Sequence, residues 1–222
     1  HLGALLAYFA LSAALIAGNA PAAGCVLLAA TAAWWYFTGR LGDADANATL
    51  VPPLAGAFGC NQLTPLVAGF CLPPARAFGA LAFSLLVSVL LASCGSYSLL
   101  GWDALTNWQF SAGLDVQASI GSLLMQPALW CIVISWIAAT GALSAFRLRP
   151  TRAFAVLGTL VASALLLAGI VLAAWVASGQ ATWMPSFNNL VFTVVPIVAM
   201  LLMCVLVPEP DWGNEEDYEG EA

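Results

Sequence analysis

The strongest constraint on this chain is a succession of apolar runs that are almost free of charge and long enough to cross a lipid bilayer. A helix rises about 1.5 Å per residue, so about 20 apolar residues span the hydrocarbon core. Six apolar runs of 15 to 25 residues are present, and we expect them to form an all-α, polytopic integral membrane bundle over residues 1–207, in contact with lipid. The runs cover residues 2–16, 22–37, 75–93, 123–146, 153–177 and 190–207.

Charge is scarce and unevenly placed. Charged residues make up 7% of the chain, against about 25% in a typical soluble domain. Seven of the eleven acidic residues lie in the last fourteen positions. This composition predicts a disordered acidic tail at residues 208–222, which follows the last membrane span.

A seventh hydrophobic stretch, residues 51–74, is interrupted. It reads VPPLAGAFGCNQLTPLVAGFCLPP and contains two similar arms, PLAGAF and PLVAGF. Each arm begins with proline, which the first turn of a helix tolerates. The pattern favours a re-entrant hairpin whose tip consists of Asn61, Gln62, Thr64 and Pro65.

The alternative is that this stretch crosses the membrane once, which would make seven spans. Twenty-two helical residues reach about 33 Å, so the length permits a crossing. However, Pro65 would remove a hydrogen bond near the centre of that helix, and Asn61 and Gln62 would lie in the apolar core. In a hairpin, neighbouring helices can satisfy the two amides. Loops of this kind often line pores or substrate paths, or they fill space in a helical bundle.

The basic residues give the expected orientation, because cytoplasmic loops of membrane proteins are enriched in Lys and Arg. With six spans and a hairpin, all five arginines face the cytoplasm, whereas seven spans would leave Arg40 outside. Both arrangements place the C-terminus in the cytoplasm, and the first places the N-terminus there too. The Ala/Leu/Gly-rich, lysine-free composition points to a bacterial plasma membrane. The residues that determine topology are Arg40, Arg76, Arg147, Arg149 and Arg152.

The chain lacks the usual signatures of catalysis. The only histidine is His1, and there is no metalloprotease, nucleophile-elbow or phosphate-loop motif. There is no basic patch for nucleic acid. We therefore expect no catalytic, cofactor-binding or metal-binding residue and no enzymatic activity in this chain. Four serines within spans have no base beside them, and we expect them to pack between helices or to bond to their own backbone. They are Ser84, Ser88, Ser93 and Ser135.

Residues 95–121 form the longest polar connection. The stretch SYSLLGWDALTNWQF could form an amphipathic helix on the outer membrane surface, with leucines and aromatic residues on one face. Two interpretations remain open, an interfacial helix that closes the bundle and an extracytoplasmic docking or sensing element. The docking residues would be Trp102, Asp103 and Trp108.

One stretch resembles a known family. Residues 34–83 contain an aromatic span end, a short Arg/Asp linker, the two Pro-Leu arms and the sequence LPPARA. In this order they resemble the membrane region that follows the kinase domain in some actinobacterial serine/threonine protein kinases. The resemblance covers about 50 of the 222 residues. It implies a cytoplasmic kinase domain N-terminal to His1, which agrees with a chain that does not begin with Met.

These observations predict a non-catalytic membrane domain that anchors, and regulates, a cytoplasmic signalling domain. One alternative is a small permease or transporter subunit with residues 51–74 lining the path. Another is a membrane assembly factor. The sequence gives no oligomeric state, ligand or transported substrate.

Overall fold

The computed structural model contains helices joined by turns, and no strands, in the part of the chain that it describes. That part comprises residues 2–17, 21–38, 48–51, 54–55, 60–93, 116–147 and 151–206. The helices are α1 (Leu2–Ala17), α2 (Pro21–Thr38), α4 (Leu63–Cys71), α5 (Pro74–Ser93), α7 (Val116–Leu124), α8 (Pro127–Arg147), α9 (Arg152–Ala177) and α10 (Phe187–Leu206). Four of them, α5, α8, α9 and α10, are long and apolar enough to cross a membrane, and α1 and α2 are shorter apolar helices.

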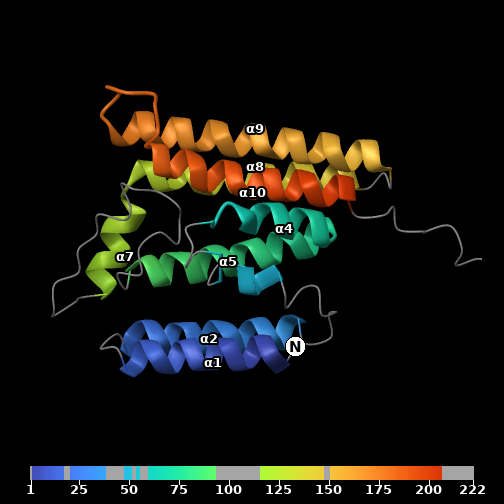
Figure 1. Cartoon of the computed structure of the whole chain (residues 1–222). Helices are drawn as coiled ribbons and strands as arrows, with labels where there is room; N and C mark the ends of the chain where they lie inside the picture. The colour runs from blue at the N-terminus through green and yellow to red at the C-terminus, as the bar shows by residue number, and fades with distance from the viewer. Residues whose placement is uncertain are drawn as a thin grey trace, which may run out of the picture.

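The helices are stacked in layers, with a short helix in the interior (Figure 1). α1 and α2 pack as a pair at one side, and α2 contacts α5. α8 and α9 form the most extensive pair, and α10 packs on α9. Helix α4, only 9 residues long, contacts α5, α8 and α10. A short helix that touches three longer ones is an interior element of the bundle.

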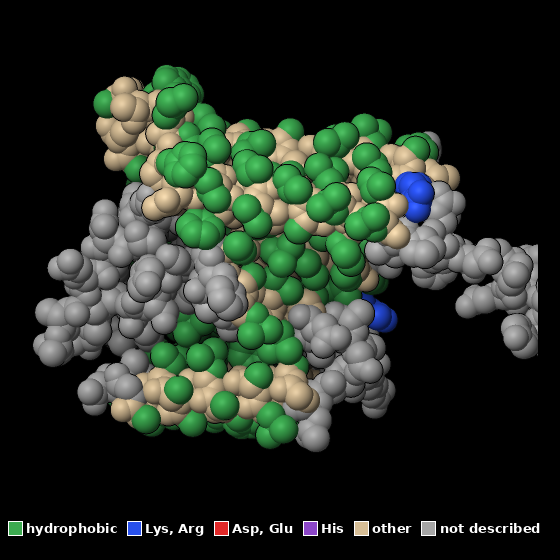
Figure 2. All heavy atoms as spheres, viewed as in Figure 1, with side chains coloured by type: hydrophobic (Ala, Val, Ile, Leu, Met, Phe, Trp, Pro, Cys, Tyr) green, Lys and Arg blue, Asp and Glu red, His purple; other side chains and the backbone are tan. Residues whose placement is uncertain are grey.

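One end of the bundle carries the basic residues, and we call it the arginine end. Here α5 has Arg76 in its first turn, α8 ends at Arg147 and α9 begins at Arg152. Figure 2 shows the two arginine side chains that the structure describes, both at this end. Helix α1 begins at the same end (Figure 1).

The outer surface of the bundle is apolar. Leu160 of α9 is 50% exposed, and Val195 and Leu202 of α10 are 51% and 53% exposed. The described ranges contain no Asp or Glu, and hydrophobic side chains cover much of the face seen in Figure 2. Soluble proteins seldom expose apolar surface of this extent, whereas lipid covers it in a membrane. The chain is therefore a multi-pass helical membrane protein.

Glycines allow three helix pairs to approach closely. A Cβ atom added to Gly24 of α2, Gly69 of α4 or Gly169 of α9 would lie 2.5, 2.8 or 2.3 Å from the nearest side-chain atom of the facing helix. The facing helix is α1 for Gly24 and α8 for the other two. Small residues at such contacts are typical of helix packing in membranes, where dispersion contacts replace hydrophobic burial.

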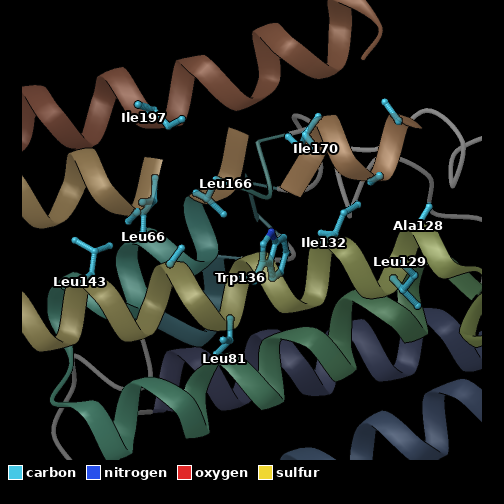
Figure 3. Packing of buried hydrophobic residues seen from close by; sticks show 14 of the residues in the cluster. Leu66, Leu81, Ala128, Leu129, Ile132, Trp136, Leu143, Leu166, Ile170 and Ile197 are labelled. Atoms are coloured by element: carbon cyan, nitrogen blue, oxygen red, sulfur yellow. The ribbon is translucent and has the colours of Figure 1, made fainter. Parts of the chain in front are cut away.

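The main core lies where α4, α5, α8, α9 and α10 meet. Trp136 of α8 is at its centre, packed with Leu66 of α4, Leu81 of α5, Leu166 of α9 and Ile197 of α10 in one cluster (Figure 3). Trp136 is fully buried. Trp136 of α8 and Leu66 of α4 share this cluster, so the packing of α4 depends on α8.

The structure corrects the sequence prediction at one connection. The span predicted to begin at residue 123 begins at Pro127, and the predicted polar connection 95–121 is shorter because helix α7 starts at Val116. Proline disfavours helical conformation in the preceding residue, so α7 and α8 are separate helices. The other predicted spans agree with the observed helices to within three residues at each end.

Candidate functional site

The residues predicted to form the hairpin tip are all buried in the bundle. Asn61 and Thr64 have no exposed surface, Gln62 is 1% exposed, and Pro65 is buried. Burying a side-chain amide among apolar helices is costly unless it is hydrogen-bonded, because an unbonded polar group loses its hydration without compensation. The partners of these side chains therefore define the site.

Gln62 is bonded to the central tryptophan. The indole Nε1 of Trp136 donates to Oε1 of Gln62 at 2.7 Å. Indole nitrogen is a donor only, so this bond identifies the amide oxygen as the acceptor and directs the Nε2 group elsewhere. Trp136 is the tenth of 21 residues in α8, so Gln62 lies at the middle of that helix.

A second bond joins the start of α4 to α8 nearer the arginine end. The hydroxyl of Thr140 donates to the backbone carbonyl of Pro65 at 3.2 Å. Pro65 is the third residue of α4, where its missing N–H removes no hydrogen bond of the helix. Gly69 then packs against Thr140 and Leu143. Helix α4 thus follows α8 from its middle toward its arginine end.

Backbone bonds close the tip. The N–H of Cys60 donates to the carbonyl of Ala55 at 2.8 Å, and the N–H of Leu63 donates to Cys60 at 3.0 Å. The N–H of Thr64 donates to the carbonyl of Asn61 at 2.9 Å. The last two bonds join residues three apart and form the turn from which α4 starts.

The two sides of the broken segment meet again at its base. Ala48 lies in one buried cluster with Leu72, Ala77 and Ala80, so the chain before the segment and the chain after it pack on the same part of α5. The hydroxyl of Tyr8 in α1 donates to the carbonyl of Thr49 beside this cluster.

The polar side chains around α4 differ in how they are satisfied. Ser135 donates to the carbonyl of Ile132 at 2.7 Å, as predicted for a back-bonded serine. Ser84 and Ser88 are buried, but their Oγ atoms have no hydrogen-bond partner among the described residues. The back-bonded alternative is therefore wrong for these two serines. The side chain of Ser93 lies outside the described part.

The remaining predicted residues are partly covered by the structure. Arg76 and Arg152 are exposed at the arginine end, and Arg147 closes α8 there. The docking residues predicted in the 95–121 connection, two other arginines and the acidic tail lie outside the described residues. These are Trp102, Asp103, Trp108, Arg40, Arg149 and residues 208–222.

Sequence reasoning did not identify the partners of the tip. Trp136 and Thr140 lie four residues apart on α8, which puts them on one helical face. That spacing was visible, but nothing local to either residue indicated that the face would meet Gln62 and Pro65. Comparison of the chain with models of known protein families, with characterised proteins and with solved structures gives no match.

Proposed function

We propose that this chain is a non-catalytic membrane domain that anchors and regulates a cytoplasmic signalling domain at its arginine end. The observation that carries the proposal is the common location of the start of α1 and of the arginines at the ends of α5, α8 and α9. Basic residues favour the cytoplasmic side, so a domain attached before α1 would face the cytoplasm. The resemblance of residues 34–83 to kinase membrane regions agrees with this arrangement.

The proposal includes six spans and a re-entrant hairpin in a bacterial plasma membrane. Two contacts support the hairpin. Gln62 meets Trp136 at the middle of α8, and Ala48 lies in one buried cluster with Leu72 at the base. A segment that reaches mid-depth and returns to its starting cluster fits re-entry better than crossing. Because α4 is bonded to α8, a movement of the hairpin would be transmitted through α8 to the arginine end. A signalling domain attached at that end would be regulated by this movement.

The experiment is the intact mass of the native polypeptide, captured from source membranes with an antibody to residues 208–222. We expect a mass above the 23.0 kDa of this chain by about 30 kDa or more, the size of at least one further domain. A native mass near 23.0 kDa would overturn the anchoring proposal.

A second candidate function is a small permease with residues 51–74 lining the path. The observation that favours it is the buried amide of Gln62 at the middle of α8, whose Nε2 atom has no hydrogen-bond partner among the described residues. In this case, solute flux into proteoliposomes would be lost when Asn61 and Gln62 are replaced by leucine. Unchanged flux in that variant, with the same amount of folded protein, would rule out the hairpin as the path.

A further inference from the structure

The connection between α9 and α10 begins with a well-defined helix end. The N–H of Gly179 donates to the carbonyl of Val176 at 3.2 Å. The N–H of Gln180 donates to the carbonyl of Trp175 at 2.8 Å. This pair of bonds is the common C-terminal motif that needs a left-handed residue after the helix, and Gly179 supplies it with a φ of 63°. The chain therefore leaves α9 in one fixed direction.

Two serines fix the rest of the connection. Oγ of Ser178 accepts a hydrogen bond from the N–H of Thr182 at 3.1 Å. Oγ of Ser186 accepts one from the N–H of Asn189 at 3.3 Å, so Ser186 caps α10, which begins at Phe187. The side chains that this connection exposes are therefore held in place by local hydrogen bonds.

The connection exposes three large apolar side chains. Trp183 is 57% exposed, Met184 is 86% exposed and Phe187 is 79% exposed. We call these three residues the loop patch. The ring of Trp183 stacks on Trp175 in the last turn of α9, with ring centroids 4.7 Å apart and planes 15° apart. Trp183 thus lies beside the end of α9, at the level of its last turn.

The lengths of the helices place the loop patch at a membrane boundary. The 20 residues of α10 extend over about 30 Å, the thickness of a hydrocarbon core, and the 26 residues of α9 extend over about 39 Å. Because α9 begins at the arginine end, the loop patch lies at the opposite end. Trp130, the fourth residue of α8, is exposed near the same end. Tryptophan is enriched at membrane–water boundaries.

The loop patch is continuous with the lipid-covered surface of the bundle. Leu190 and Val194 are exposed on α10, three and seven residues after Phe187. Residues at this spacing share one face of a helix. In Figures 1 and 2 the connection stands out beside the end of α9 and carries hydrophobic side chains. The apolar surface of α10 therefore extends onto the connection.

The chemistry of this surface identifies its partner. Residues 178–187 contain no charged residue, so an ionic partner has no counterpart here. Water is a poor neighbour for three large apolar side chains in one place. A protein partner would have to displace lipid from the continuous face of α10. Lipid suits the patch, because the ring of tryptophan is apolar and its N–H can donate to an oxygen of the lipid.

We infer that the loop patch is an interfacial lipid-binding element. It inserts Trp183, Met184 and Phe187 into the layer where phospholipid headgroups meet acyl chains, at the end of the bundle opposite the arginines. Its partner is a phospholipid without net charge, and the contact holds the connected ends of α9 and α10 at this depth. The inference goes beyond the anchoring function and does not depend on it.

Photo-crosslinking of the full chain in phosphatidylcholine nanodiscs tests the inference. Photo-methionine, a diazirine analogue, replaces every methionine, and mass mapping resolves the adducts by site. Two methionines of α10 are controls, since Met203 is 53% exposed and Met200 is 5% exposed. We expect lipid adducts at Met184 and Met203, each several-fold above Met200. Products of water at Met184 in place of lipid adducts, or a crosslink to a second protein chain, would overturn the inference.

The lipid composition gives a second result. Because residues 178–187 carry no charge, addition of phosphatidylglycerol is expected to leave the yield of lipid adducts at Met184 unchanged. A yield that requires the anionic lipid would contradict a partner without net charge.

The depth of Trp183 can be measured independently by fluorescence. The difference in emission between the natural chain and Trp183→Phe reports this one residue, and phenylalanine keeps a ring that can stack on Trp175. We expect brominated phosphatidylcholine to quench the difference several-fold more strongly with bromine near the headgroup than with bromine near the chain end. Equal quenching, or none, would contradict insertion at the boundary. The native mass tests anchoring separately, so the two proposals can fail independently.

Discussion

A buried hydrogen bond between the side chains of Trp136 and Gln62 joins α8 to the turn before α4. In apolar surroundings this bond does more than add its own energy. It also prevents the amide oxygen of Gln62 from being buried without a donor. The pair therefore fixes the turn before α4 at the middle of α8.

Trp136→Phe tests this role. The substitution keeps an aromatic ring in the core but removes the Nε1 donor, so Oε1 of Gln62 is left unpaired. We expect a loss of about 1 to 3 kcal/mol in the free energy of unfolding, measured by denaturant titration in mixed micelles. In a double-mutant cycle, Gln62→Leu restores part of this loss, because it removes the unpaired oxygen.

The control for Trp136→Phe is Trp130→Phe. Trp130 also donates a hydrogen bond, to the carbonyl of Leu124 at 2.8 Å, but the side chain is 49% exposed. Loss of this bond leaves the carbonyl of Leu124 at an exposed site, where it is not sealed in the core as the Gln62 oxygen is. An equal effect of the two substitutions would show that burial of the amide is not what makes Trp136 important.

Tyr8 is a second residue whose hydroxyl can be tested alone. It is 3% exposed, its ring packs edge-on against Phe83 at 5.2 Å, and its hydroxyl bonds to the carbonyl of Thr49. Tyr8→Phe keeps the ring contact and removes only the hydroxyl. We expect about 0.5 to 1.5 kcal/mol of destabilisation in the same titration. Tyr36→Phe, at a side chain that is 81% exposed, is expected to have a smaller effect.

At the scale of elements, α4 is held by close approach as well as by hydrogen bonds. A Cβ atom at Gly69 would lie 2.8 Å from Cβ of Leu143 and 2.9 Å from the carbonyl oxygen of Thr140. The backbone of α8 cannot easily move aside, because its other face packs closely on Gly169 of α9. A larger residue at position 69 must therefore displace α4.

Gly69→Ala is expected to destabilise the protein by about 1 to 3 kcal/mol, the range for overpacking of a core. Gly3→Ala is the control, since a Cβ atom there meets nothing within 4 Å. Alanine has the higher helix propensity, so that control is expected to be neutral or slightly stabilising. Thermal unfolding of both variants in the same detergent gives the comparison, and a neutral Gly69→Ala would contradict the close contact.

The elements also show what sequence could and could not predict. Helix positions followed from hydropathy, because a membrane span needs a long apolar run whatever its partners are. The boundary between α7 and α8 was missed although Pro127 marks it, since the apolar run continues across the proline. The tip residues were identified by their polarity within an apolar stretch, but their burial was not predicted. Their partner Trp136 could not be predicted, because pairing depends on the relative depth of two helices that are far apart in the chain.

At the scale of the whole molecule, the arginine end and the path of residues 51–74 together determine the topology. With re-entry, the connection between α1 and α2 lies on the side of the membrane opposite to the connection before α9. With a seventh crossing, these two connections lie on the same side. The difference is large because one added crossing inverts every segment that precedes it.

Cysteine labelling distinguishes the two arrangements. Asn19→Cys lies between α1 and α2, Thr151→Cys lies directly before α9, and Ala181→Cys lies between α9 and α10. With a membrane-impermeant thiol reagent added to sealed cells, we expect Asn19→Cys and Ala181→Cys to react and Thr151→Cys to react only after permeabilisation. Site-resolved mass mapping separates these thiols from the native cysteines. If Asn19→Cys behaves like Thr151→Cys, residues 51–74 cross the membrane, and the cluster that joins Ala48 to Leu72 does not persist in the bilayer.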